Sequence, residues 1–170
     1  SLEEIKLYLL LYYLQYSYQS KENIMSEEST TELLNILNKL DQTELDQYIQ
    51  QYGHTETNVF IFSEYIAKHH LSVATIVRNS KGLISKSYIY DILSGTKKNP
   101  SRDILLILCI AANMDRKSTR RILEVYGQRD LYAKDTRDII IATYINNKNF
   151  NLDLINDELY RHNLPTLHSC

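Results

Sequence analysis

The sequence predicts an all-α protein, and three observations support this fold class. Only 4 of the 170 residues are Gly and 2 are Pro, so few positions would interrupt a helix. Apolar residues recur at the spacing of one helix face almost throughout the chain, and not at the alternating spacing of a strand. The hydrophobic content of 44% is that of a globular protein, and a chain of this length can bury a core.

Before residue 57 we expect three helical segments that together form an acidic extension. Residues 2–18 are apolar and Tyr-rich and can form a helix. Residues 29–32 read Ser-Thr-Thr-Glu, which matches a capping box and predicts a second helix start. Asp41 or Thr43 can begin the next helix, and the polar stretch 50–57 is the best candidate for a domain boundary.

Five helices are predicted between residues 58 and 127, which we assign to one domain. The first spans about 63–70, and the fourth, 104–112, is apolar all round, as expected of a helix at the centre of a bundle. Side chains that can accept hydrogen bonds from a first helical turn stand before the other helices. These cap residues are Ser72, Ser85, Ser101 and either Asp115 or Ser118, and Gly127 can end the fifth helix.

The residues after 127 are expected to add two helices that pack on this domain. Asp135 and Asn151 can each cap one of them. The predicted organisation is therefore an acidic helical N-terminal extension (1–57), a five-helix domain (58–127) and a C-terminal helical extension (128–170).

Charge is distributed unevenly along the chain, whose net charge is −2. Residues 1–57 hold three basic and ten acidic residues, a balance of −7. Residues 58–105 hold seven basic and three acidic residues, a balance of +4, and the rest of the chain holds nine and eight, a balance of +1. A basic bias confined to the predicted domain is the electrostatic footprint expected of a nucleic-acid-binding surface, although solvated helix faces also carry such an excess.

The order of features from residue 62 to 101 resembles a known DNA-binding motif. Two short helices are followed by a Gly/Ser turn, a helix rich in hydroxyl and aromatic residues, and a Lys-Lys-Asn-Pro-Ser boundary. This order resembles the helix-turn-helix of the lambda-repressor/Cro superfamily, the XRE-type family of bacterial and phage proteins. The resemblance implies a lambda-repressor-like five-helix domain in which one helix braces on the phosphate backbone while the next lies in the major groove.

A wider resemblance extends over about residues 33–167. It is to a Firmicute-type group of the same family, in which two extra C-terminal helices follow the five-helix domain. The matching stretches are 99–103 (Asn-Pro-Ser-Arg-Asp), 131–132 (Leu-Tyr), 137–141 (Arg-Asp-Ile-Ile-Ile) and 163–167 (Asn-Leu-Pro-Thr-Leu).

If the third helix of the motif enters the major groove, its first residues and its exposed face must reach base edges. The residues expected in this role are Ser85, Lys86, Ser87, Tyr88 and Tyr90. Contacts to the phosphate backbone would fall to the second helix and to the flanking turns, which fix the register without reading sequence. The residues expected there are Ser72, Thr75, Lys81, Lys97, Lys98 and Asn99.

Several of these residues have a second, structural interpretation. Ser85 can be a helix cap instead of a base reader, and Lys97 and Lys98 can form a solvated turn. Tyr88 and Tyr90 diverge by about 200° around a helix, so one of the two rings is expected in the core.

Patterns typical of an enzyme or a metal site are missing from the sequence. The adjacent His69 and His70 would point about 100° apart on a helix, which is poor geometry for a shared metal. Neither a Gly-rich phosphate loop nor a nucleophile elbow is present. Cys109 and Cys170 are expected to be free thiols, and no stretch reaches the ~20 apolar residues of a membrane span. We therefore expect a cytoplasmic, non-enzymatic protein without metal or cofactor.

Two functions are compatible with these patterns. The first is a transcriptional regulator that binds duplex DNA sequence-specifically as a homodimer. The second is a helical adaptor that uses the same fold to bind protein through the Tyr/Leu-rich segment 7–18. The adaptor is suggested by Val73, which replaces a Gln common in the family, and by the turn 80–85, which is longer than in the family. The acidic N-terminal region could also fold over the basic motif and inhibit it.

Overall fold

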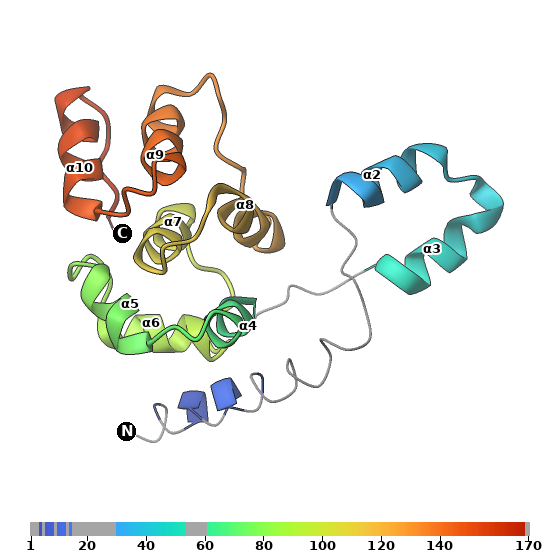
Figure 1. The fold of residues 1–170 in the computed structure, drawn as a ribbon, viewed down its shortest axis with the longest axis horizontal. Coiled ribbons are helices and arrows are strands. Elements are labelled where there is room, and N and C mark those ends of the chain that lie inside the picture. The colour runs from blue at the N-terminus through green and yellow to red at the C-terminus, as the bar shows by residue number, and fades with distance from the viewer. Residues whose placement is uncertain are drawn as a thin grey trace.

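A computed structural model describes residues 4, 6–8, 10–12, 14, 30–53 and 61–168 of the protein. All regular structure in these residues is helical, which confirms the predicted all-α class. The described residues from 4 to 14, which we call the N-terminal segment, are helical as well. The other helices, shown in Figure 1, are α2 (Thr30–Lys39), the short 3-10 helix η1 (Gln42–Glu44), α3 (Leu45–Tyr52), α4 (Ile61–Lys68), α5 (Val73–Asn79), α6 (Lys86–Leu93), α7 (Arg102–Ala111), α8 (Arg116–Val125), α9 (Thr136–Asn146) and α10 (Leu152–Arg161).

Helix α7 lies at the centre of the helices after residue 60, as its uniformly apolar sequence predicts. Every residue from Ile104 to Ala111 is buried, and helices α5, α8 and α10 contact α7. Figure 1 shows α7 with α5 and α6 on one side and α9 and α10 on the other. The buried apolar cluster runs from Ile61 to Leu167 and includes Leu7 of the N-terminal segment. One hydrophobic core therefore joins the N-terminal segment to α4–α10.

The helix starts follow the predicted caps closely. The side chains of five predicted cap residues accept a hydrogen bond from a backbone N–H of the first turn, which otherwise has no helical partner. At α8 the cap is Asp115 and not Ser118. The residues that cap in this way are Ser85, Ser101, Asp115, Asp135 and Asn151.

Other boundaries differ from the sequence-based expectation. Ser72 holds the N-cap position of α5, but its side chain makes no capping hydrogen bond among the described residues. Helix α3 continues to Tyr52, inside the stretch expected to be a linker, because the Tyr48 and Tyr52 rings pack on one helix face with centroids 4.9 Å apart. Asp41 begins η1 through a capping box with Glu44. The capping box expected at 29–32 lies partly outside the described residues.

Two helical hairpins, α7–α8 and α9–α10, are joined by reciprocal ion pairs. Each hairpin begins with the sequence Arg-Asp-Ile, at 102–104 and at 137–139. Arg102 Nη2 donates to both carboxylate oxygens of Asp138 at 3.0 Å. In return, Arg137 donates to the two carboxylate oxygens of Asp103 at 2.9 and 2.7 Å. These contacts, which we call the reciprocal Arg–Asp pairs, hold the starts of α7 and α9 together.

Candidate nucleic-acid interface

Helices α5 and α6 correspond to the second and third helices expected of the motif. Each presents an apolar stripe to the core: α5 buries Ile76, and α6 buries Ile89 and Ile92. The Ser63 hydroxyl of α4 donates to the backbone carbonyl of Leu93, which ties the end of α6 to α4. The opposite sides of α5 and α6 are therefore left facing outward.

The turn between the two helices, residues 80–85, is ordered by local contacts. The buried Ser80 hydroxyl donates to the Val77 carbonyl at 2.7 Å. Lys81 and Gly82 then take left-handed backbone conformations, with φ of 55° and 73°, and the second of these suits a glycine. Ile84 turns inward and is only 2% exposed. Because Ile84 is anchored in the core, this turn gives α6 a fixed starting point.

Three of the predicted DNA-contacting residues come together at the starts of α5 and α6. Ser72, Lys86 and Tyr90 line a single cavity of about 650 Å³. The other wall of this cavity belongs to the N-terminal segment, which contributes Glu4 and Leu7 among others. The expected reading helix is therefore in contact with the N-terminal segment at its first turn.

Lys86 makes the central polar contact at this place. Its Nζ lies 2.8 Å from a carboxylate oxygen of Glu4 and 5.7 Å from the centroid of the Tyr90 ring. The hydrogen bond from Lys86 is the largest cause that lowers the pKa of Glu4, which falls to about 2. The hydrogen bond to Glu4 raises the pKa of Lys86 in turn. The pair is consequently charged on both sides at neutral pH.

Tyr88 and Lys97 form a second cluster on another side of α6. The Lys97 ammonium lies 5.6 Å from the centroid of the Tyr88 ring. The expectation that either Tyr88 or Tyr90 is a core residue is wrong, because both rings are half-buried and pack against the edge of the core. Each ring also has a lysine ammonium near it, Lys97 at Tyr88 and Lys86 at Tyr90.

The remaining predicted residues occupy varied environments. Ser85 is the α6 cap, in agreement with its structural interpretation, and its hydroxyl lies 3.4 Å from that of Ser87. Lys81 extends toward α10, where its Nζ lies 3.5 Å from Asp153. Thr75 accepts a hydrogen bond from Arg78 at 3.4 Å. Lys98 and Asn99 are exposed.

Arg78 is a candidate contact that the sequence-based selection missed. It is exposed on α5, one turn after Thr75, and lies beside a residue already expected to touch phosphate. Helical spacing places residues three apart on the same face, so the position of Thr75 could have identified Arg78. We use the name α5–α6 face for the full set, which is Ser72, Thr75, Arg78, Lys81, Ser85, Lys86, Ser87, Tyr88, Tyr90, Lys97, Lys98 and Asn99.

The described residues give little support for a metal site, a reactive thiol or a membrane span. They contain no group of three or more His, Cys, Asp or Glu side chains placed to hold a metal ion. His69 stacks on the Tyr65 ring with centroids 4.1 Å apart. Cys109 is a buried free thiol whose pKa is raised by burial, as expected of inert core packing, whereas Cys170 lies outside the described residues. Among the described helices, each is too short or too polar to cross a membrane.

Comparisons with protein-family models, with curated proteins and with solved structures found no significant match for this chain.

Proposed function

We propose that this protein is a transcriptional regulator that binds duplex DNA through the α5–α6 face. The observation that carries the proposal is the charge of this face: residues 71–99 contain five basic residues and one acidic residue. Arg78, Lys97 and Lys98 are exposed, and none of them pairs with a carboxylate in the part of the chain that the structure describes. Cations of this kind are available to neutralise phosphates and release counterions.

Sequence readout falls to α6 in this proposal. Ser87 is exposed and lies on the side of α6 away from the buried Ile89 and Ile92. Its hydroxyl can donate to or accept from a base edge, and Lys86 can donate to guanine acceptors. A single α6 reads only a few base pairs, so we further propose a homodimer whose two α6 helices meet a palindrome about 34 Å apart.

The test is selection of bound sequences from a random duplex library by the purified full chain, followed by anisotropy titration of the best sequence at several salt concentrations. An enriched palindrome is the expected result, with an affinity that falls steeply as salt rises. If no sequence is preferred over random competitor at moderate salt, the proposal is wrong.

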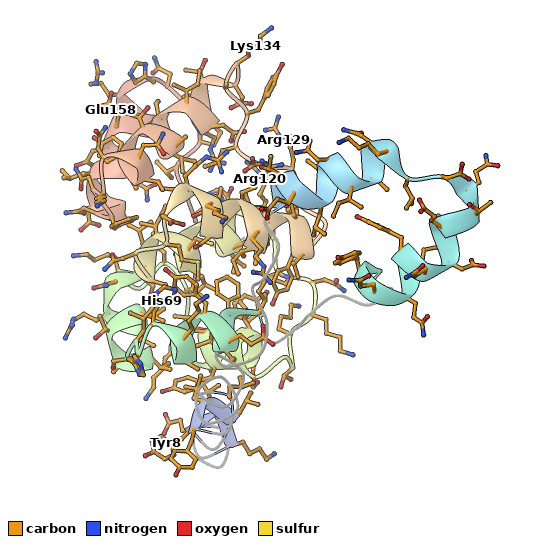
Figure 2. The ribbon with its side chains drawn as sticks, turned by 45° about the vertical axis from the view of Figure 1, so that its right-hand side comes forward. Tyr8, His69, Arg120, Arg129, Lys134 and Glu158 are labelled. Carbon is orange, nitrogen blue, oxygen red and sulfur yellow. The ribbon has the colours of Figure 1, made fainter. Side chains whose placement is uncertain are left out.

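A matched pair of variants assigns the binding to the α5–α6 face. Lys97→Ala/Lys98→Ala should weaken binding to all sequences alike and reduce the salt slope by about 2, because two phosphate contacts are lost. The control Lys117→Ala/Lys134→Ala removes the same charge from exposed positions elsewhere; Figure 2 shows Lys134 at the opposite end of the molecule from Tyr8. Equal losses in the two variants would mean that net charge, and not this face, determines the affinity.

Protein binding is a second candidate function because two aromatic rings of the N-terminal segment are largely exposed. Tyr8 is 70% exposed and Tyr12 is 66% exposed, one helical turn apart. Such a pair can anchor an amphipathic segment on a partner. If the DNA selection fails with folded protein, these two residues are the first positions to substitute in a search for protein partners.

A further inference from the structure

The N-terminal segment docks on the α5–α6 face by an amphipathic side. Leu7 is 1% exposed and belongs to the main core cluster. Leu11, one turn later, packs partly against the same cluster, while Tyr8 and Tyr12 are largely exposed and line the cavity shared with α5 and α6. Leu7 and Leu11 are four residues apart, so both lie on one side of a helix. The segment is therefore held by apolar burial and not only by its charged contact.

The N-terminal segment docks on the same α5–α6 face that the proposed function assigns to DNA binding. It shares a cavity with Ser72 at the start of α5 and with Lys86 and Tyr90 on α6. In both Figure 1 and Figure 2 it lies on the outer side of α5 and α6, away from α7–α10. A DNA duplex that contacts the first turn of α6 would therefore have to share this surface with the N-terminal segment, which already binds Lys86.

Glu4 of the N-terminal segment and the acceptor groups of DNA would also compete for the same side chain, Lys86. Glu4 places a carboxylate 2.8 Å from Lys86, the side chain expected to donate to a base or a phosphate. Among the described residues of the N-terminal segment only Glu4 and Lys6 are charged, so its electrostatic competition with phosphate depends on the contact of Glu4 with Lys86. While Glu4 neutralises Lys86, this lysine is less able to attract a phosphate or a base acceptor.

We propose that the N-terminal segment is an internal competitor of DNA, which occupies the starts of α5 and α6 and must leave before α6 can enter the major groove. This inference rests on the proposed function, because it concerns the regulation of the same face. DNA and the docked segment are mutually exclusive, so the measured affinity for DNA is reduced by the fraction of molecules in which the segment is undocked.

The size of the expected effect follows from the contacts. The pair between Lys86 and Glu4 is 60% and 40% exposed and contributes little on its own. The buried Leu7 contributes most, and a segment docked in about nine molecules of ten would weaken the apparent affinity about tenfold. Weakening the docking should therefore tighten DNA binding, by more for a change at Leu7 than for a change at Glu4.

The experiment compares DNA affinities of full-length variants on the selected duplex. Leu7→Asp should tighten binding by up to about tenfold. Glu4→Gln, which leaves the core untouched, should tighten it about twofold to threefold. The control Asp46→Asn removes one exposed acid from α3, outside the docked segment. This control should leave the affinity within about twofold of wild type.

A second measurement follows the segment directly and guards against misfolding of Leu7→Asp. A fluorescent label on Tyr12→Cys, in a Cys170→Ser background, should become more mobile when the selected duplex is added. Unchanged label mobility at saturating DNA would overturn the inference, and so would equal DNA affinities of wild type, Leu7→Asp and Glu4→Gln. If no variant binds any duplex, including those with an undocked segment, the proposed function itself fails and this inference falls with it.

Discussion

The two halves of the molecule use their charged residues in different ways. In α7–α10 the arginines at the helix starts make bidentate contacts to carboxylates of the same chain, as Arg102 does to Asp138 and Arg116 to Asp130. On the α5–α6 face, Arg78, Lys97 and Lys98 are exposed without such partners among the described residues. Charges in the first region hold the fold together, and charges in the second remain available to a ligand.

The two regions are also anchored by different forces. The start of α9 is fixed by a buried carboxylate that three donors share, because Asp138 also accepts from the Tyr132 N–H at 3.0 Å and lies 3.1 Å from Arg129. The start of α6 is fixed by the burial of Ile84 and by a cap. Consequently, loss of a charged partner should damage the start of α9 most, and an apolar truncation should damage the start of α6 most.

The largest effect is expected at Asp138, which is 1% exposed. Asp138→Asn leaves the nearly buried Arg102 guanidinium without a compensating charge and should lower the free energy of unfolding by about 3–5 kcal/mol. Urea denaturation measures this change. Asp157→Asn removes an exposed carboxylate from α10 and should change the same quantity by less than about 0.5 kcal/mol. Similar losses in the two variants would show that the reciprocal Arg–Asp pairs do not hold the hairpins together.

A somewhat smaller effect is expected from Ile84→Ala in the turn before α6. Removal of this buried side chain should cost about 2–4 kcal/mol, because a cavity remains where the turn was anchored. The matched control is Ile139→Ala on α9, where the side chain is 41% exposed and the loss should be less than about 1 kcal/mol. Thermal unfolding of both variants measures these losses of stability. If Ile84→Ala costs no more than the control, apolar burial does not fix the start of α6.

The sequence predicted the local features of both regions well. Caps such as Ser101 and Asp135 were found because a capping side chain acts on an N–H only two or three residues away, so its partner is visible in the sequence. The central position of α7 followed from its apolar surface, since a helix without a polar side must be covered on all sides.

Long-range features were not predicted, for a physical reason. The reciprocal Arg–Asp pairs join residues about one hairpin apart in the chain, and only the packing of the α9–α10 hairpin on the α7–α8 hairpin brings them together. The repeated Arg-Asp-Ile was visible in the sequence, but a repeat alone does not say that its two copies pair. Likewise, Leu7 in an apolar segment gave no indication that it enters the core beside α5 and α6.

A moderate effect is expected from loss of the α6 cap. The Ser85 hydroxyl accepts from the Tyr88 N–H at 3.3 Å. Ser85→Ala leaves this N–H without its partner and should lower the free energy of unfolding by about 1 kcal/mol, whereas Ser85→Asp should retain the cap and most of the stability. Chemical denaturation of both variants tests the structural interpretation of Ser85. A cost that appears in DNA affinity and not in stability would instead identify Ser85 as a base reader.

The smallest effect is the pH dependence of the α8 cap. The hydrogen bond from the Ser118 N–H holds the pKa of Asp115 below its ordinary value of 3.8. Because the folded pKa lies below the unfolded one, the ionised carboxylate contributes its full stabilisation above about pH 4, and this contribution decreases below that pH until it is lost as pH falls through the lower folded pKa. Asp115→Asn keeps a cap that does not titrate, as does Asp115→Ser. The wild type should therefore exceed both variants by at most about 1 kcal/mol at pH 6, since Asp115 is only partly buried, and this difference should shrink when the free energy of unfolding is measured at pH 3. A difference that stays constant between the two pH values would mean that the charge on Asp115 contributes nothing to the cap, and that hydrogen bonding alone begins α8.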